Sequence, residues 1–301
     1  MNYNKRYVAA ITARIRIFLY SFFLSFFKSN PNIKIIDGSK TYIFGSTEIS
    51  KRIFKSYIKM KEDGGKDSFS PSPVWQNILD VTYKDLLDSH KFNDFKKFEK
   101  FINNFGHSKK YTGLTYKILI PRFFNFFRNQ YIKKNMLDNQ FKKWNFFTNN
   151  KNIKELNTPK YGNHHGGYIQ NSTFVTHTSF YHEIYGSILA NFLHDKSNPI
   201  IAEIGGGFGS LTRIIMLDQK IKYFIIDLPE TIALSTFFLN QNFPEKKILT
   251  YNNIKNNKLI VDDIANYDII MIPPWVNFEN IKIDLFINTR SMMEMNFDTF
   301  V

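Results

Sequence analysis

An acid and three alternating glycines form the stretch of this sequence that is best suited to binding a ligand. They are Glu203, Gly205, Gly207 and Gly209, and they lie between a short apolar run and a segment with helical spacing. Glycine lets the backbone approach a ligand closely, and the start of the following helix offers free N–H groups. The pattern therefore predicts a strand, a tight turn and a helix, with a binding site at the turn.

The spacing of the glycines separates two classes of ligand. A dinucleotide-binding turn has the pattern Gly-x-Gly-x-x-Gly, whose third glycine packs the helix on the strand, and here Ser210 occupies that position. Alternating glycines with an acid two residues ahead instead resemble the S-adenosylmethionine (SAM) loop of class I methyltransferases. That resemblance implies that Glu203 lies near the amino group of the methionine moiety and that the glycines admit this moiety. A strand-to-helix turn that merely requires glycine is the remaining alternative.

A second acid, Asp227, follows the apolar run at 222–226 and lies 18 residues after Gly209. An acid at the end of the second strand can accept hydrogen bonds from both hydroxyls of a ribose, in SAM folds and dinucleotide folds alike. Pro229 then marks the start of a helix that extends to about Leu239. Asp227 is therefore a predicted cofactor ligand, and a plain helix cap is its alternative.

Three further candidates follow later strands. Trp275 comes after the apolar run at 267–272, in the sequence Pro-Pro-Trp. Amino-methyltransferases hold an amine with an acidic or amide residue before two prolines, but Ile272 has no acceptor there, so Trp275 is expected to line the adenine side. Asn288 ends a strand at 283–289, and Glu294 follows it. Residues just past the carboxyl end of a parallel strand face the ligand crevice, so both are expected at the site.

Histidines give weaker signals. His164 and His165 are adjacent in a glycine-rich loop at 159–168, and adjacent side chains converge poorly on one metal, so no metal site is predicted. His182 lies on a predicted helix over about 180–194 that leads to the glycine loop. It could line the ligand crevice, or it could be a surface or satisfied histidine.

Charge is divided unevenly along the 301 residues. The formal net charge is +14, and residues 1–160 hold 30 Lys and Arg against 12 Asp and Glu, whereas residues 161–301 hold 10 against 14. A basic half is attracted to anionic lipid, anionic glycan or nucleic acid, or is simply a solvated helical surface. The chain has no cysteine, which excludes disulfides, thiolate nucleophiles and thiolate metal sites.

The N-terminal half is predicted to be mainly helical. A short strand is expected at 34–36, a helix at 48–60, an exposed linker at 61–73, and mostly helices from 74 to 144 with aromatic residues on their buried faces. Burial of the rings argues against nucleic-acid binding. The apolar run at 17–27 has 11 residues, too few to span a membrane, and no signal-peptide cleavage site follows. It is expected to form an interfacial helix or a buried one.

The second half resembles a family of sugar O-methyltransferases from surface-polysaccharide and lipopolysaccharide gene clusters. The resemblance covers the chain from about residue 160 and is carried by the glycine loop, by Asp-Leu-Pro-Glu at 227–230, by Tyr-Asp-Ile-Ile at 267–270 and by the stretch 284–295 with its Asn-x-x-Ser-x-x-Glu-Met pattern. The Asp-Leu-Pro sequence also resembles plant-type small-molecule O-methyltransferases, whose catalytic histidine has no counterpart that we can place.

We therefore expect an α/β fold. A basic, mainly helical region at 1–160 is expected to precede a Rossmann-like class I methyltransferase domain at 161–301. A complete domain of this class has seven strands, so the sheet is expected to be incomplete at the C-terminus. A short further strand is expected near 247–251.

The resemblance implies an enzyme that transfers the methyl group of SAM to a sugar or glycan hydroxyl. The absence of cysteine fits a cytoplasmic location, and the basic N-terminal region is a candidate for peripheral contact with the inner face of the membrane. Glu294 is the first candidate for the base that takes the hydroxyl proton, and His182 is the second. Two alternatives stay open. One is a truncated, non-catalytic SAM-fold protein that acts as a membrane-surface or partner scaffold, and the other is a nicotinamide-dependent oxidoreductase.

Overall fold

The computed structural model describes ten stretches of the chain. They are residues 33–37, 43–64, 69–106, 138–152, 161–164, 166–170, 173–175, 179–218, 220–289 and 291–295. The helix expected at 17–27 and the residue His165 lie outside these ranges.

The N-terminal region is helical, as predicted. Its helices are α2 (Thr47–Asp63), α3 (Pro73–Thr82), α4 (Lys84–Lys91), α5 (Phe95–Asn103) and α7 (Asp138–Phe147). Side chains that accept a backbone N–H begin three of them: Ser46 starts α2, Ser72 starts α3 and Asp94 starts α5. The linker expected from residue 61 starts later, because α2 continues to Asp63.

Aromatic side chains form the core of these helices. The ring of Phe98 lies 4.9 Å from that of Phe54 and 5.7 Å from that of Tyr57, centroid to centroid. Phe98 and Tyr57 are fully buried. The helical spacing therefore places these rings inside the protein, where they cannot serve as a stacking surface for bases.

A small antiparallel sheet joins distant parts of the chain. Strand β1 (Ile33–Asp37) pairs with β2 (Gly166–Gln170), which pairs with β3 (Thr173–Val175). The strand expected at 34–36 is confirmed, but the loop expected at 159–168 is wrong from residue 166 onward. Glycines at 166 and 167 suggested a turn, yet a backbone ladder needs no side chains, and pairing with β1 overrides the local preference.

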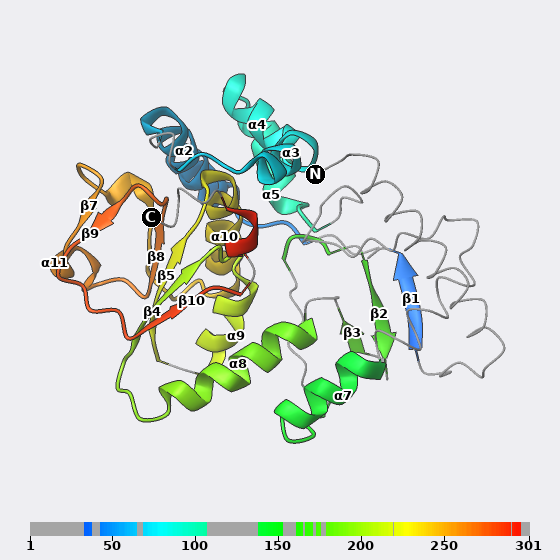
Figure 1. The fold of residues 1–301 in the computed structure, drawn as a ribbon. Helices are drawn as coiled ribbons and strands as arrows, with labels where there is room; N and C mark the ends of the chain where they lie inside the picture. The colour runs from blue at the N-terminus through cyan, green and yellow to red at the C-terminus, as the bar shows by residue number, and fades with distance from the viewer. Residues whose placement is uncertain are drawn as a thin grey trace, which may run out of the picture.

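The second half contains a five-stranded parallel sheet, so the predicted α/β, Rossmann-like fold is confirmed (Figure 1). Its order is β10-β4-β5-β8-β6. The strands are β4 (Ile200–Ile204), β5 (Lys222–Ile226), β6 (Ile248–Leu249), β8 (Ile269–Ile272) and β10 (Leu285–Ile287). The inner strands β4, β5 and β8 are apolar and buried, as a sheet covered on both faces requires.

Three helices accompany the sheet: α8 (Ser179–Leu193) leads into β4, α9 (Ser210–Asp218) joins β4 to β5, and α10 (Pro229–Asn242) follows β5 (Figure 1). Shorter elements complete the described part, namely η5 (Tyr251–Asn253), β7 (Lys258–Leu259), α11 (Val261–Ile264), β9 (Asn277–Phe278) and η6 (Ser291–Glu294). None of the described helices is both long and apolar enough to cross a membrane.

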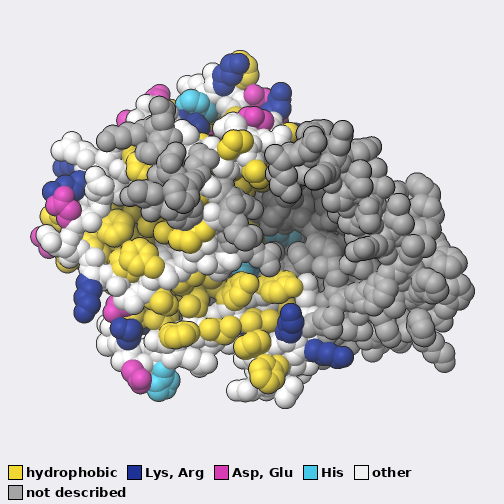
Figure 2. Space-filling model, viewed as in Figure 1, with side chains coloured by type: hydrophobic (Ala, Val, Ile, Leu, Met, Phe, Trp, Pro, Cys, Tyr) yellow, Lys and Arg dark blue, Asp and Glu magenta, His cyan; other side chains and the backbone are white. Residues whose placement is uncertain are grey.

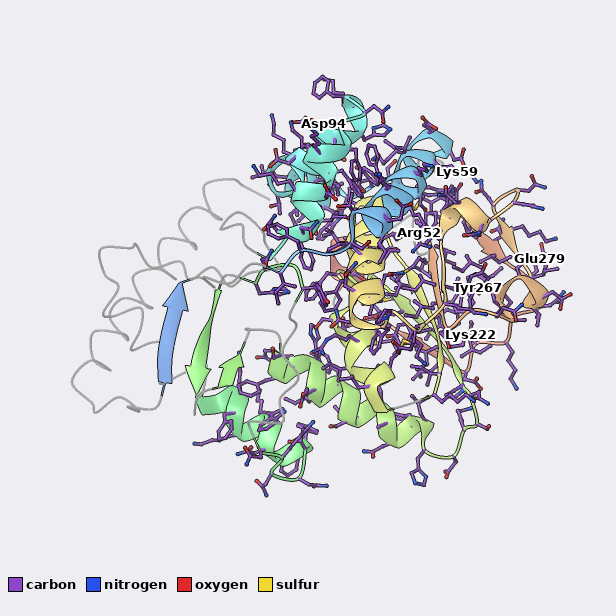
Figure 3. All side chains as sticks on the ribbon, turned by 180° about the vertical axis from the view of Figure 1, so that it is seen from behind. Arg52, Lys59, Asp94, Lys222, Tyr267 and Glu279 are labelled. Carbon is purple, nitrogen blue, oxygen red and sulfur yellow. The ribbon has the colours of Figure 1, made fainter. Side chains whose placement is uncertain are left out.

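Lys222, at the start of β5, connects the sheet to the end of α11 by hydrogen bonds. Its ammonium group donates to the carbonyl oxygens of Ile264, Ala265 and Tyr267, the first of which ends α11. Figure 3 labels Lys222 and Tyr267, which lie close together. Carbonyl groups at a helix end have no partner inside the helix and carry partial negative charge, so a lysine there satisfies them.

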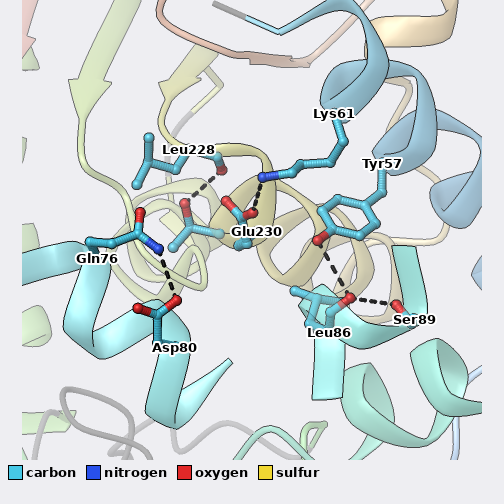
Figure 4. A network of polar contacts seen from close by, with 9 residues as sticks. Tyr57, Lys61, Gln76, Asp80, Leu86, Ser89, Leu228 and Glu230 are labelled. Atoms are coloured by element: carbon cyan, nitrogen blue, oxygen red, sulfur yellow. Dashed lines mark hydrogen bonds and ion pairs between the residues drawn. The ribbon is translucent and has the colours of Figure 1, made fainter. Parts of the chain in front are cut away.

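The helical region and the sheet share one core. Helix α2 packs along α10, and the Lys61 ammonium lies 2.7 Å from the carboxylate of Glu230 (Figures 1 and 4). The Glu230 side chain is 2% exposed, whereas Lys61 is 28% exposed. One cluster of buried hydrophobic side chains contains residues of both parts of the chain, from Ile53 in α2 to Val276 after β8. The domain boundary at 160/161 thus stays a prediction, and the core crosses it.

Lys61→Met should destabilise the protein by about 2 kcal/mol, because Glu230 would stay buried without its cation while Lys61 itself is only partly buried. Urea unfolding measures this. The control is Lys51→Met, whose partner Glu48 is exposed and 4.0 Å away, and which should cost less than about 0.5 kcal/mol. Equal costs for the two variants would contradict the role given to the buried pair.

Candidate functional site

The glycine loop lies at the point of the sheet where the strand order reverses, because the chain adds strands first on one side of β4 and then on the other. Strand β4 has β5 on one side and β10 on the other, and the loop at 205–209 leaves the carboxyl end of β4 toward α9. In open α/β sheets, ligands bind outside the carboxyl ends of the strands at such a position. The arrangement brings Glu203, Asp227 and Asn288 to one edge, since each lies at or just past the end of one of these three strands.

All three predicted glycines have a left-handed backbone, with φ of 76° at Gly205, 56° at Gly207 and 84° at Gly209. Two of them are also places of close packing. A Cβ at Gly205 would lie 2.0 Å from the Ser291 hydroxyl oxygen, and one at Gly209 would lie 2.9 Å from Leu239 in α10. Because these two residues have no side chain, the loop can pack against the turn that follows β10 and against α10.

Gly207 is different, because a Cβ built there meets no atom of the described residues within 4 Å. Its N–H donates to Oδ2 of Asp227 over 2.9 Å. The middle of the loop therefore faces open space beside a carboxylate. A ligand at this position would meet both the loop backbone and the acid.

Asp227 is held by the backbone. Besides the bond from Gly207, its Oδ1 accepts the N–H of Leu228 over 2.7 Å. Burial raises the pKa of this carboxyl to about 6, against the lowering effect of its hydrogen bonds with Thr231, Leu228 and Gly207. The two oxygens together offer about four acceptor sites, and these three bonds leave one of them for a ligand hydroxyl.

Glu203 lies beneath the loop and is 2% exposed. Its Oε2 accepts from the hydroxyl of Tyr223 over 2.9 Å and from that of Thr212 over 3.4 Å, and it lies under Gly206. Burial raises its pKa to about 7, opposed by the Tyr223 bond and assisted by the negative charge of Asp227. The structure therefore shows Glu203 bonded to groups of its own fold, and contact with a methionine moiety stays a prediction.

Asn288 and Ser291 both bind the last carbonyl of β4. The Asn288 amide donates to Ile204 O over 2.9 Å, and the Ser291 hydroxyl donates to the same oxygen over 2.8 Å. Asn288 Oδ1 also accepts the N–H of Met292, over 3.3 Å. These bonds fix the turn after β10 beside Gly205. Glu294 belongs to η6 in the same turn, and its side chain lies outside the described part of the structure.

Trp275 lies further along the same edge. Its indole N–H donates to the hydroxyl of Tyr251 over 3.3 Å, and that hydroxyl in turn donates to Asp63 of α2 over 2.8 Å. Lys59 of α2 also lies 5.0 Å over the Tyr251 ring. The loops after β6 and β8 are therefore tied to the helical region. Whether Trp275 contacts an adenine stays a prediction.

His182 lies half-buried on α8, one residue before a buried acid that the sequence analysis did not select. That acid, Glu183, is 4% exposed and accepts the indole N–H of Trp144 over 3.0 Å. Lys151 lies 3.5 Å from it, and Arg213 of α9 interacts with it electrostatically. Its signal in the sequence was an acid on the inward face of an otherwise apolar helix.

His164 is a second residue whose place only the structure shows. It is 5% exposed, and its ring lies 5.4 Å from that of Phe208 in the glycine loop, centroid to centroid. No group of three or more His, Asp or Glu that could hold a metal occurs among the described residues.

Comparison of the chain with protein-family models, with curated proteins and with solved structures found no match.

Gly205→Ala should lower stability by at least about 2 kcal/mol, because alanine would combine a strained backbone with a clash against Ser291. The control is Gly64→Ala at the end of α2, where φ is 49° but the nearest atom is 4.0 Å away, so that only the backbone strain of about 1 kcal/mol is expected. Chemical denaturation measures both variants. An equal loss in both would contradict the close packing at Gly205.

Stability should depend on pH through Glu203. Its pKa rises from 4.5 in the unfolded chain to about 7 in the folded one, so its contribution is fully present below pH 4.5 and is lost as pH rises through 7. Relative to Glu203→Gln, the wild type should lose about 3 kcal/mol between pH 4 and pH 8. Urea unfolding at a series of pH values tests this, with the exposed Glu245→Gln as control. A pH-independent difference would disprove it.

Proposed function

We propose that this protein is a SAM-dependent O-methyltransferase that acts on a sugar hydroxyl in surface-polysaccharide or lipopolysaccharide biosynthesis. The observation that carries the proposal is the pairing of Gly207 with Asp227. A left-handed glycine that faces open space donates to an acid at the end of the next strand, which suits a ligand with a ribose and a compact polar end.

The residues of the loop fit such a cofactor. Gly205, Gly207 and Gly209 would let the backbone approach it, and Asp227 would accept from the ribose hydroxyls. Bound SAM would supply a methyl group on a positively charged sulfur. The dinucleotide alternative is weaker, because Gly209 packs against Leu239 and the third glycine of a dinucleotide turn is replaced by Ser210.

The chemistry requires positioning and a proton acceptor. The hydroxyl oxygen forms a bond to the methyl carbon as the carbon–sulfur bond breaks, and its proton passes to a base. Glu294 and His182 remain the candidates for that base, and Trp275 and Asn288 the candidates beside the cofactor. No metal is assigned a role. We further propose a cytoplasmic site of action, with contacts from the basic first half to anionic glycan or the inner face of a membrane and with no nucleic-acid partner.

A non-catalytic scaffold is the second candidate, and an apolar surface favours it. Phe286 on the outermost strand β10 is 56% exposed, and Phe192 on α8 is 67% exposed. Figure 2 shows hydrophobic side chains gathered over the region of α8 and β10. Exposed apolar surface beside the open edge of a sheet is typical of a site for another protein segment.

Isothermal titration with SAM should detect binding to the full chain, and Asp227→Asn should weaken it about tenfold or more, because the amide can accept fewer hydrogen bonds from a ribose. The control is Asp195→Asn, whose side chain is 96% exposed next to His194. Absence of SAM binding by the wild type would favour the scaffold, and binding of a nicotinamide dinucleotide in its place would favour the oxidoreductase.

A further inference from the structure

We propose that His164 recognises the methyl acceptor, with its Nε2 atom accepting a hydrogen bond from a neutral hydroxyl group of that substrate. The inference rests on the proposed function, because it takes the acceptor to be a sugar. It assigns a residue that neither the glycine loop nor the candidate bases include.

The turn that carries His164 is fixed by hydrogen bonds. The neighbouring residue Asn163 accepts the N–H of Ile43 over 2.8 Å and donates to the carbonyl of Asn103 over 2.9 Å. The N–H of Gly106 donates to Gly162 O over 2.7 Å. These bonds hold the turn against the end of α5.

The backbone is shaped around the imidazole ring. A Cβ at Gly106 would lie 2.6 Å from the ring nitrogen Nδ1, so only glycine allows the approach. The ring meets Phe105 edge-on at 5.4 Å and Phe208 at 5.4 Å, centroid to centroid. Phe208 directly follows Gly207, so the imidazole packs against a residue of the glycine loop itself.

One ring nitrogen is satisfied and the other is not. The imidazole hydrogen-bonds to the backbone of Tyr161, and Nε2 has no partner in the described structure. The bond to a carbonyl is therefore made by Nδ1–H, which leaves the lone pair on Nε2. An unpaired buried polar atom costs free energy and calls for an explanation, of which a ligand is one and a bound water another.

The surroundings determine what kind of partner Nε2 can take. Burial and the nearby charge of Arg213 lower the pKa of His164 to about 4, so the ring stays neutral near pH 7. A neutral ring with a free lone pair accepts a hydrogen bond and does not attract an anion. Arg213 also disfavours a cation at the same place, and the described residues offer no metal cluster. A neutral hydroxyl, as on a sugar, fits these conditions.

The test compares the full-length wild type with His164→Phe, which keeps the ring and removes both nitrogens. The variant should be at least as stable to heat as the wild type, because it loses an unpaired buried atom. It should bind SAM within threefold of the wild type, yet lose at least tenfold in binding a panel of methyl hexopyranosides, measured by titration with S-adenosylhomocysteine present. His194→Phe, at an exposed site, is the matched control.

Nitrogen-15 NMR of the wild type provides the second measurement. The Nε2 resonance of His164 should have the position of an unprotonated nitrogen at pH 7 and should shift when a hexopyranoside binds. An unmoved resonance with every sugar of the panel, or undiminished sugar binding by His164→Phe, would overturn the inference and leave only a buried water at Nε2. Failure of the wild type to bind SAM would refute the proposed function separately, since the NMR titration does not need SAM.

Discussion

The turn after β4 can close only without side chains, and much of the structure depends on that constraint. The absence of a side chain at Gly205 lets the turn after β10 approach the loop, and its absence at Gly209 lets α10 approach it. Both have a left-handed backbone that other residues adopt with strain. Of the three, Gly207 alone has no described atom near its Cβ position, so the two packed glycines fix the loop while the middle one stays uncovered. The same turn thus joins three elements and shapes the candidate site.

Buried acids connect the parts of the protein that the turn does not reach. Glu230 pairs with Lys61 of the helical region, and Glu183 binds Trp144 of α7. Glu203 is supported by two hydroxyl groups below the glycine loop. A buried carboxylate is stable only with donors around it, and Glu230 and Glu183 have their donors in helices of the N-terminal region. The helical region and the sheet therefore depend on each other for stability.

Much of the fold could be predicted from the sequence. The apolar runs at 200–204 and 222–226 are strands, the N-terminal region is helical with buried aromatic residues, and the alternating glycines form the turn. Sequence reasoning went wrong at residues 166 and 167, where pairing with β1 makes a strand of a glycine-rich segment. The burial of His164 was not predicted either, because a histidine in a glycine-rich loop gives no local sign of burial.

The sequence by itself determined the local elements and the chemistry of the loop, because helical spacing, strand alternation and turn residues act over a few positions. Only the tertiary structure decided which strands are neighbours: β8 lies between β5 and β6, and β10 lies against β4. It also decided that the Asn288 amide donates to the carbonyl of Ile204 and that the His164 ring contacts the Phe208 ring. Such contacts join residues far apart in the chain, and they follow from how whole elements bury their apolar faces together.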